Sequence, residues 1–202
     1  MLVVKELFYS LQGEGHYTGT AAVFCRFSGC NKWSGRPSDK AKSACPFCDT
    51  NFVGGEKFTE DALVEAITKL WPGGGRPRVV LTGGEPALQL TASLISNLKK
   101  LNYEVAVETN GSVPLPVSGP YWVTVSPKDE NPVVTSGHEL KVLWPNPKTH
   151  PQNYQMLDFR YFYVQPIDDE NYAENMRTAV EYCLANPQWA LSLQQHKIVG
   201  IQ

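Results

Sequence analysis

The sequence predicts an α/β fold, an incomplete TIM-like β/α barrel with fewer helices than strands. Short runs rich in β-branched and aromatic residues recur along the whole chain, and each is bounded by Gly, Pro or Asn, as strands commonly are. Amphipathic helical patterns separate some of these runs, and strands that alternate with helices favour a parallel sheet. Two connections, 110–120 and 127–138, carry five prolines between them and no helical period. Helices are therefore expected to be absent at two places where a complete barrel has them.

The predicted strands share this composition, and they cover residues 2–8, 21–29, 78–82, 103–109, 121–126, 139–144, 160–166 and 189–194. Three helices are predicted over residues 59–71, 91–102 and 169–186, where apolar residues recur at helical spacing. Thr59 stands at the N-cap position of the first helix, with Glu60 and Asp61 in its first turn. The chain has no repeat, linker or low-complexity tract, so one domain is expected over residues 1–202.

Composition and charge exclude several classes of protein. The 202 residues are 42% hydrophobic and 19% charged, which is ordinary for a globular domain and unlike a disordered chain. The net charge of −2 gives no electrostatic reason to expect binding to nucleic acid or to an anionic membrane. No stretch approaches the roughly eighteen apolar residues of a membrane helix, and the N-terminus lacks the apolar run of a signal peptide. We therefore expect a cytoplasmic protein with no nucleic-acid or membrane partner.

Polar residues follow several of the predicted strands. Functional groups of parallel α/β folds gather where the strands end and the loops begin. Cys30 follows the second predicted strand, the sequence GGEP follows the third, and Glu108 lies at the end of the fourth. The sequences SPK and QPID follow the fifth and seventh strands. The sequence therefore predicts an active site at this rim of the barrel.

The five cysteines, at positions 25, 30, 45, 48 and 183, are an odd number in an expected cytoplasmic chain, which disfavours a disulfide framework. A structural zinc site needs four ligands, and Cys30 has no histidine near it, because the closest, His16, precedes its strand. A redox pair needs only Cys45 and Cys48, but these lie in an irregular loop. Three thiolates suit a four-iron cluster with one iron open to a ligand. The spacing favours the cluster and leaves the other two readings open.

The sequence VVLTGGEPAL adds a second motif. Gly83 and Gly84 allow the backbone to approach a ligand closely, and Glu85 offers an acceptor for an amino group. Beside the three cysteines, this loop resembles the radical S-adenosylmethionine (SAM) superfamily. In that superfamily the open iron binds SAM and the glycine-rich loop holds the amino group of SAM.

The resemblance implies a partial β/α barrel of the radical SAM type, with Cys30, Cys45 and Cys48 as ligands of a [4Fe-4S] cluster. The superfamily usually has three residues between the first two cysteines. This chain has fourteen, and the difference is an insertion at residues 31–44.

Further motifs, in order along nearly the whole chain, resemble the 7-carboxy-7-deazaguanine synthase family: LQGEG, CDT, TGGEP, VETNG, SPK, LKVL, QPID and the ending LQQHKIVGIQ. The resemblance implies a lyase that converts 6-carboxy-5,6,7,8-tetrahydropterin to 7-carboxy-7-deazaguanine with loss of ammonia, in the biosynthesis of queuosine and other 7-deazapurines. One alternative is an activase of glycyl-radical enzymes, whose cysteine spacing is short and which lacks LQGEG. Others are a non-catalytic zinc-binding module and a pterin-binding protein without activity, although the latter would be expected to lack one of the three cysteines.

The family resemblance also implies a set of site residues. SAM is expected to contact Phe47, Asp49, Gly83, Gly84, Glu85, Ser126, Lys128, Gln165 and Asp168. The pterin is expected to contact Leu11, Gln12, Gly13, Glu14, Arg26, Thr82, Glu108, His196 and, through the terminal carboxylate alone, Gln202. Thr50 is expected to bring Mg²⁺ to the site. Simpler explanations exist for several of them: packing for Phe47, solvation for Lys128, an internal ion pair for Arg26, a turn hydrogen bond for Thr50 and a surface position for His196.

The resemblance implies a homodimer and an electron donor. The insertion at 31–44 carries four cations against one acid, namely Lys32, Arg36, Lys40 and Lys42 against Asp39. The simpler explanation is a solvated loop, and the functional one is a docking patch for an acidic reductant such as flavodoxin. Cys25 and Cys183 match no functional position and are expected to behave as small apolar residues.

Overall fold

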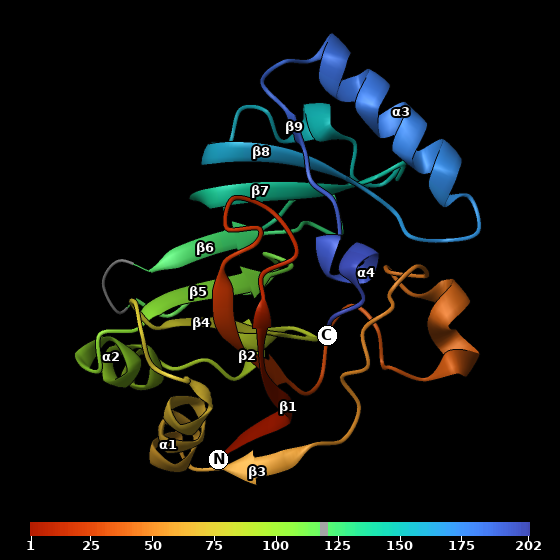
Figure 1. The fold of residues 1–202 in the computed structure, drawn as a ribbon. Coiled ribbons are helices and arrows are strands. Elements are labelled where there is room, and N and C mark those ends of the chain that lie inside the picture. Colours follow the sequence, from red (N-terminus) through yellow and green to blue (C-terminus); the bar gives the residue numbers. More distant parts are fainter. Residues whose placement is uncertain (118–120) are drawn as a thin grey trace.

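The structure, a computed structural model, describes residues 1–117 and 121–202. Its strands form one sheet, in the order β3-β1-β2-β4-β5-β6-β7-β8-β9 (Figure 1). The strands are β1 (Leu2–Leu11), β2 (Ala21–Phe27), β3 (Glu56–Phe58), β4 (Arg78–Gly83), β5 (Glu104–Thr109), β6 (Trp122–Val125), β7 (Ser136–Trp144), β8 (Asp158–Pro166) and β9 (Ala190–Leu191). The helices are α1 (Glu60–Leu70), α2 (Ala92–Lys100), α3 (Tyr172–Ala185) and α4 (Gln195–Val199), with short 3₁₀ helices η1 (Pro37–Lys42), η2 (Pro86–Leu88) and η3 (Pro151–Asn153).

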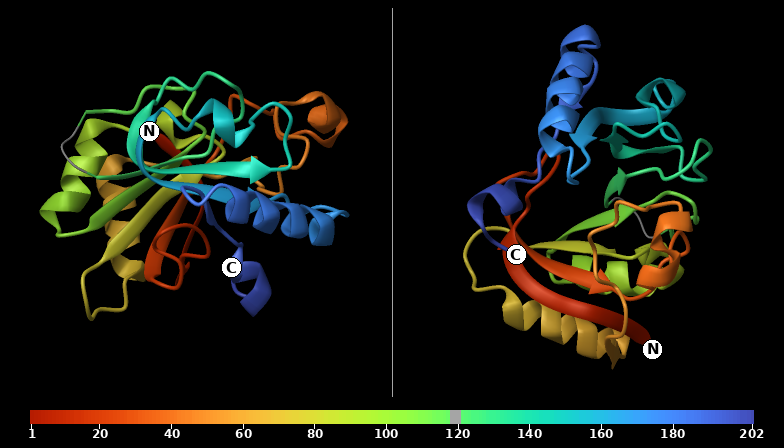
Figure 2. Two further views of the ribbon diagram at one scale, coloured as in Figure 1. Left: turned by 90° about the horizontal axis from the view of Figure 1, so that it is seen from above. Right: turned by 90° about the vertical axis from the view of Figure 1, so that its right-hand side faces the viewer.

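The sheet is an open barrel. From β2 onward each strand pairs in parallel with its neighbour, whereas β1 runs antiparallel to β2, and β3 runs antiparallel to β1. The sheet curves, and its two end strands, β3 and β9, stay apart (Figures 1 and 2). The predicted incomplete barrel with few helices is thus confirmed. The connection 110–120, predicted to lack a helix, lies partly outside the described residues.

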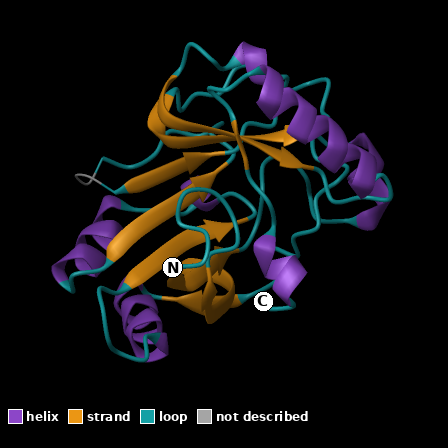
Figure 3. Ribbon diagram, turned by 45° about the horizontal axis from the view of Figure 1, so that its top comes forward, coloured by secondary structure: helices purple, strands orange, loops and turns teal. Residues whose placement is uncertain are grey.

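Helices cover the outer side of the sheet in two groups, with α1 and α2 beside one half and α3 beside the other (Figure 3). Thr59 caps α1 as predicted, because its hydroxyl accepts a hydrogen bond from the amide of Ala62 at 3.2 Å. Cys25 lies fully buried in the core under α1 and α2, and Cys183 packs half-buried beside the core under α3. Both behave as the predicted small apolar residues. None of the helices described has the length and apolar content that a membrane span requires.

Side chains alternate along the strands, so one set points to the outer face of the sheet and the other to the barrel interior. On β2, Val23, Cys25 and Phe27 join the outer core, while Arg26 faces the interior cavity. The same alternation turns polar residues inward on the later strands, such as Glu108 on β5. The parallel strands therefore supply a ring of polar side chains without weakening the outer core.

The β1–β2 connection, residues 12–20, folds into the barrel and closes one end of it. The His16 ring stacks on Trp122 and Tyr161 with centroids 5.2 and 4.4 Å away. Tyr17 packs edge-on against Trp122 at 4.5 Å, and the Arg78 guanidinium lies 3.4 Å from the centroid of the Tyr17 ring. These aromatic rings fill the end of the barrel where the parallel strands begin. The interior is left open at the other end, where the strands reach their carboxyl termini.

Two elements differ from the sequence prediction. The three-residue strand β3 was not predicted, because Glu56–Phe58 is too short to carry a strand pattern. The chain end contains Ile198, Val199 and Ile201, and β-branched residues of this kind are typical of strands. It forms the short helix α4 instead, closed by Gly200 in the left-handed region at φ 70°. The first amide of α4, that of Gln195, donates to Gly13 at 2.9 Å, so a tertiary contact overrides the local preference.

The insertion at 31–44 contains the 3₁₀ helix η1 and packs on itself and on the barrel rim. The indole of Trp33 donates to the Asp39 carboxylate at 2.9 Å and packs edge-on against Phe52 at 5.4 Å. The Lys32 ammonium lies 2.5 Å from Asp129, in the β6–β7 connection. These contacts give the insertion a defined position beside the strand termini.

Candidate active site

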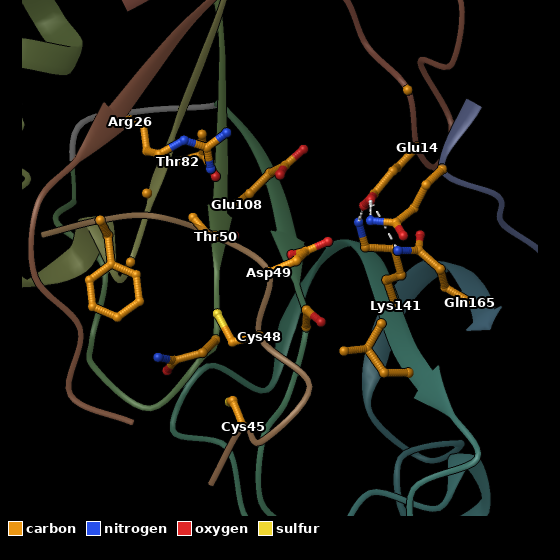
Figure 4. A pocket seen from close by; sticks show the side chains of 18 of the residues that line it. Glu14, Arg26, Cys45, Cys48, Asp49, Thr50, Thr82, Glu108, Lys141 and Gln165 are labelled. Atoms are coloured by element: carbon orange, nitrogen blue, oxygen red, sulfur yellow. Dashed lines mark hydrogen bonds and ion pairs between the residues drawn. The ribbon is translucent and has the colours of Figure 1, made fainter. Parts of the chain in front are cut away.

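A cavity of about 480 Å³ lies inside the barrel at the carboxyl ends of the parallel strands. Figure 4 shows Asp49 and Thr50 between the two labelled cysteines and the group formed by Arg26 and Glu108. Every predicted site residue except Glu85 lines this cavity: Leu11, Gln12, Gly13, Glu14, Arg26, Cys30, Cys45, Phe47, Cys48, Asp49, Thr50, Thr82, Gly83, Gly84, Glu108, Ser126, Lys128, Gln165, Asp168, His196 and Gln202. The fold thus brings together residues from both ends of the chain and from six of its strands or the loops that follow them.

The three cysteines of the motif line one end of the cavity as free thiols. Burial raises the pKa of Cys45 to about 11, and the nearby thiols of Cys48 and Cys30 add to the rise, whereas Lys128 opposes it. Burial also raises the pKa of the Cys30 thiol, although the amides of Lys32 and Trp33 donate to it and lower its pKa in part. The ionisation of each of these two thiols is therefore opposed by the neighbouring cysteines.

Gly84 is required beside the cysteines because the chain passes very close to it. A Cβ atom at position 84 would lie 2.1 Å from the carbonyl oxygen of Gly29 and 2.9 Å from the Cβ of Cys30. The amide of Gly84 donates to Phe27 at 3.1 Å, and that of Glu85 donates to Gly29 at 2.9 Å. The glycine-rich loop is thereby held directly against the loop that carries the first cysteine.

These residues fit a [4Fe-4S] cluster. Three soft thiol ligands line one end of a cavity, and the adjoining glycine loop presents no side chain that would fill it. Within the described part of the chain, no three His, Cys, Asp or Glu side chains are placed to bind a single metal ion.

Glu85 supports the loop from behind. Its side chain is fully buried, and its two carboxylate oxygens accept hydrogen bonds from the Thr109 hydroxyl at 2.6 Å, the Asn110 amide at 2.7 Å and the Ala87 amide at 3.0 Å. The carboxylate therefore faces these donors and lies outside the cavity lining. In this arrangement the groups that the GGEP loop presents to the cavity belong to Gly83 and Gly84. A direct contact between Glu85 and an amino group of SAM stays a prediction.

Lys128 lies in the cavity beside the cysteines and donates to the Ser126 hydroxyl at 2.7 Å. Burial lowers the pKa of its ammonium, and the nearby Cys45, in its thiolate form, opposes this effect. The sequence left open whether this lysine is solvated, and the structure places it inside the site. Of the cations that lower the pKa of the buried Cys45 thiol, Lys128 has the larger effect and Lys32 the smaller.

Polar groups of the predicted pterin site gather at the other end of the cavity. The Gln12 amide donates to the Glu108 carboxylate at 2.8 Å. Burial raises the pKa of Glu108, and the nearby Lys141 ammonium partly offsets this rise. Arg26 forms the internal ion pair that the sequence offered as its simpler explanation, with its Nε 2.6 Å from Glu6. The remaining guanidinium donors belong to a residue that lines the cavity, so the ion pair and a ligand contact are compatible.

Sequence analysis missed Lys141 of β7, which lines the cavity and pairs with Glu14. Only 7% of the lysine side chain and 15% of the glutamate side chain are exposed. The other Glu14 oxygen accepts from Gln165 and Gln194, each at 3.0 Å. Figure 4 shows Glu14, Lys141 and Gln165 pointing toward one another. The signal was present, because LKVL places a lysine in an apolar strand, where an unpaired charge is very costly.

Charge pairing dominates this contact. Burial by itself would raise the pKa of Glu14, but the Lys141 charge and its hydrogen bond outweigh burial and lower the pKa to about 2. The same pairing raises the pKa of Lys141 above its ordinary value, against the effect of burial. Both groups are therefore charged at neutral pH. The Glu14 side chain is occupied by protein partners, so the loop can offer a ligand its backbone groups rather than this carboxylate.

The C-terminal segment forms one wall of the cavity. The His196 ring lies against Gly13 so closely that a Cβ at position 13 would come within 2.0 Å of it. The Gln202 backbone oxygen accepts from the Ser10 hydroxyl at 2.6 Å, and its side-chain amide donates to Glu6 at 3.2 Å. Both residues line the cavity, and their contact with a pterin stays a prediction.

Comparison with known proteins gives consistent results. The profile of the Radical SAM superfamily matches residues 37–117, which include Cys45, Cys48 and the glycine-rich loop. The chain is 52% identical to the 7-carboxy-7-deazaguanine synthase of Caulobacter vibrioides and 50% identical to that of Burkholderia multivorans, with 98% of each chain covered in both cases. Identity to the synthase of Bacteroides thetaiotaomicron is 39% over the whole of both chains. The crystal structure of QueE from Escherichia coli superposes with a TM-score of 0.72 at 24% identity, covering 96% of this chain and 94% of that one, which shows a shared fold.

The buried pair predicts a large effect of one substitution. Lys141→Met leaves the Glu14 carboxylate in the barrel interior without its partner, and breaking a buried pair in this way costs about 3–5 kcal/mol. Urea unfolding of the anaerobically purified protein measures the change. Adding Glu14→Gln should restore part of the loss, because the unpaired charge is removed.

Lys69→Met is the matched control. Lys69 pairs with Glu65 on the exposed surface of α1, at 73% and 67% side-chain exposure. Its loss should change the free energy of unfolding by no more than about 0.5 kcal/mol. Equal effects of the two lysine substitutions would show that the Glu14–Lys141 pair does not hold the loop.

Proposed function

The chain belongs to the 7-carboxy-7-deazaguanine synthase family, and from this premise we propose that it converts 6-carboxy-5,6,7,8-tetrahydropterin to 7-carboxy-7-deazaguanine. It is a radical SAM enzyme of the lyase class, and the reaction contracts the ring and releases ammonia. The observation that carries the proposal is the shared cavity. Three thiols at one end face the LQGEG loop and Glu108 at the other, although these segments are far apart in sequence.

Cys30, Cys45 and Cys48 would hold the [4Fe-4S] cluster. When bound, the cluster and SAM supply the radical chemistry, and the protein supplies placement and protection from side reactions. The Gly83–Gly84 backbone, pressed against the Cys30 loop, would hold the methionine end of SAM. The other predicted SAM contacts, Phe47, Asp49, Ser126, Lys128, Gln165 and Asp168, line the same cavity, which supports their assignment. Glu85 would act mainly by fixing the loop.

The pterin would bind at the other end of the cavity. Its amino edge presents N–H donors, and the Glu108 carboxylate is the acceptor placed there, oriented by the Gln12 amide. Arg26, already fixed by Glu6, would direct its free N–H groups to the substrate carboxylate. Thr82 and the Gly13 backbone add hydrogen-bonding groups along the wall. Because the barrel end is filled by aromatic rings, the bound ring would be shielded from water on that side.

The tail would complete the substrate site. His196 lies against the LQGEG loop, the backbone oxygen of Gln202 accepts from Ser10, and the side-chain amide of Gln202 donates to Glu6. An imidazole and a carboxylate offer hydrogen-bonding groups to a reacting ring. Burial lowers the pKa of His196, while Glu14 opposes that shift, so a neutral imidazole is favoured near pH 7.

Reconstitution tests the proposed reaction directly. We expect the anaerobic, iron-loaded protein with dithionite, SAM, Mg²⁺ and 6-carboxytetrahydropterin to form 7-carboxy-7-deazaguanine. Cys45→Ala should lose both the brown colour and the product, because it removes one ligand of the cluster. Cys183→Ala should keep both, since Cys183 packs against the core under α3, away from the cavity.

Other outcomes of this assay support other functions. A brown protein that forms 5′-deoxyadenosine but no deazapurine would contradict the substrate and would be consistent with an activase. A colourless protein that holds zinc would contradict the cluster and would support a binding module.

We propose that Mg²⁺ binds at Thr50, which lines the cavity between Cys48 and the Arg26–Glu108 group. A hydroxyl, a substrate carboxylate and water are the hard oxygen ligands that this ion prefers. Thr50→Val should raise the Mg²⁺ concentration needed for half-maximal product formation by about tenfold, which corresponds to about 1.4 kcal/mol. Thr135→Val, an exposed threonine before β7, is the control. An unchanged Mg²⁺ dependence in Thr50→Val would contradict this assignment.

The reductant and the assembly are further parts of the proposal. An acidic donor such as flavodoxin would dock on the insertion at 31–44, where Arg36 is exposed and Lys40 lies 5.5 Å from the Trp33 ring. Turnover with flavodoxin should then slow steeply with added salt, while turnover with dithionite should not. We also propose a cytoplasmic homodimer built from one radical SAM domain over residues 1–202, and light scattering in solution measures its mass.

A further inference from the structure

The C-terminal segment, residues 194–202, is attached to the barrel mainly through the predicted substrate loop. The Gln195 amide donates to the Gly13 carbonyl at 2.9 Å, and the Gln194 side chain donates to Glu14 at 3.0 Å. The last residue, Gln202, is tied to β1 by the Ser10 hydroxyl. These contacts fix the position of the segment relative to β1 and the loop that follows it. They do not by themselves fix α4 relative to the cysteine end of the cavity.

Lys197 makes that connection. Its Nζ lies 2.5 Å from the Asp49 carboxylate and 2.6 Å from the Asp168 carboxylate. Asp49 follows Cys48 directly, in the loop beyond β2, whereas Asp168 follows β8 near the other end of the sheet order. One ammonium thus joins three segments: α4, the cysteine loop and the loop after β8. All three residues line the cavity.

The open barrel makes this contact more than a surface ion pair. The strand order places five strands from β4 to β8 beyond β2, and among the described strands β3 and β9 are not paired with each other. Among the described residues, strand pairing therefore connects the loops after β2 and β8 only the long way round the sheet. A side-chain contact across the gap is a direct restraint on their separation. Asp49 and Asp168 are also two of the predicted SAM contacts, and His196, next to Lys197, is a predicted pterin contact.

An ordinary exposed ion pair is the simpler explanation. The side chains of Lys197, Asp49 and Asp168 are 36%, 52% and 39% exposed, and pairs of this kind contribute little to stability. The two explanations differ in what they predict. An ordinary pair affects neither stability nor binding, whereas a restraint on loop positions affects ligand binding while stability changes little.

We propose that Lys197 is a positioning residue. It holds α4 at a fixed position relative to the loops that carry Asp49 and Asp168, so that His196 and the LQGEG loop are oriented toward the pterin. This inference rests on the proposed function for the identity of the ligand. The contact acts through Asp49 and Asp168, and Lys197 itself need not touch either ligand.

Binding of the pterin in the absence of SAM tests the proposal. The probe is 6-carboxytetrahydropterin, measured by anaerobic equilibrium dialysis against the cluster-loaded protein in its oxidised state, in which no turnover occurs. Lys197→Gln should weaken binding by about tenfold, equivalent to about 1.4 kcal/mol. Asp168→Asn should also weaken binding, although Asp168 belongs to the predicted SAM side. The double variant should bind no worse than Lys197→Gln alone, because both changes break one contact.

Whether Asp168→Asn weakens or tightens pterin binding distinguishes a positioning role of Lys197 from a general electrostatic effect. The pterin carries a carboxylate, so a general field effect would make binding weaker on loss of the lysine but tighter on loss of the aspartate. Tighter binding by Asp168→Asn would therefore overturn the proposal. So would binding by both variants within twofold of the Lys69→Gln control, which removes an exposed ion pair on α1.

A second measurement does not depend on the ligand. Amide hydrogen exchange of residues 194–202 should accelerate in Lys197→Gln and in Asp168→Asn but not in Lys69→Gln, since the helix loses its attachment to the rim. Unchanged exchange would overturn the positioning role even in an active enzyme. If the wild-type protein binds no pterin while exchange still responds to Lys197→Gln, the proposed substrate fails and the contact stands.

Discussion

The buried ion pair between Glu14 and Lys141 is the contact on which the interior of this barrel depends. A charged pair away from water persists only with good geometry and with its remaining hydrogen-bonding capacity satisfied, and here Gln165 and Gln194 satisfy the glutamate. The pair draws the β1–β2 connection into the barrel. The Gln12 contact with Glu108, the aromatic group around Trp122 and the attachment of α4 all follow from that position.

An open sheet has to define its cavity by other means than strand pairing. Three segments do so in this protein: the β1–β2 connection closes one end, the insertion at 31–44 packs beside the cysteines, and the C-terminal segment forms the wall near the gap. Each is held by side-chain contacts to strands or loops distant in sequence. A small domain can thus surround a cavity with few helices, because polar side chains take over the role of the missing elements.

Sequence reasoning succeeded where chemistry is written into short motifs. The cysteines, the glycine-rich loop and Glu108, which sequence analysis placed where strands end, line one cavity, because parallel strands bring their ends together. It failed for α4, whose β-branched residues suggest a strand. It also failed for the contacts of Glu85 with Thr109 and Asn110 and of Lys141 with Glu14, which join segments far apart in the chain. Local sequence patterns contain no information about which charged residue pairs with a given side chain inside the barrel.

The sequence by itself determined the type of fold, the positions of the cysteine motif and the family, since these depend on local composition, spacing and order along the chain. The tertiary structure decided that Glu85 faces Thr109 and Asn110, that the Glu14 side chain is taken by Lys141, and that Lys197 joins two loops from distant parts of the sheet. These outcomes depend on long-range distances and on the cost of leaving a buried charge or hydrogen-bonding group unpaired, which is settled only when the whole chain has packed.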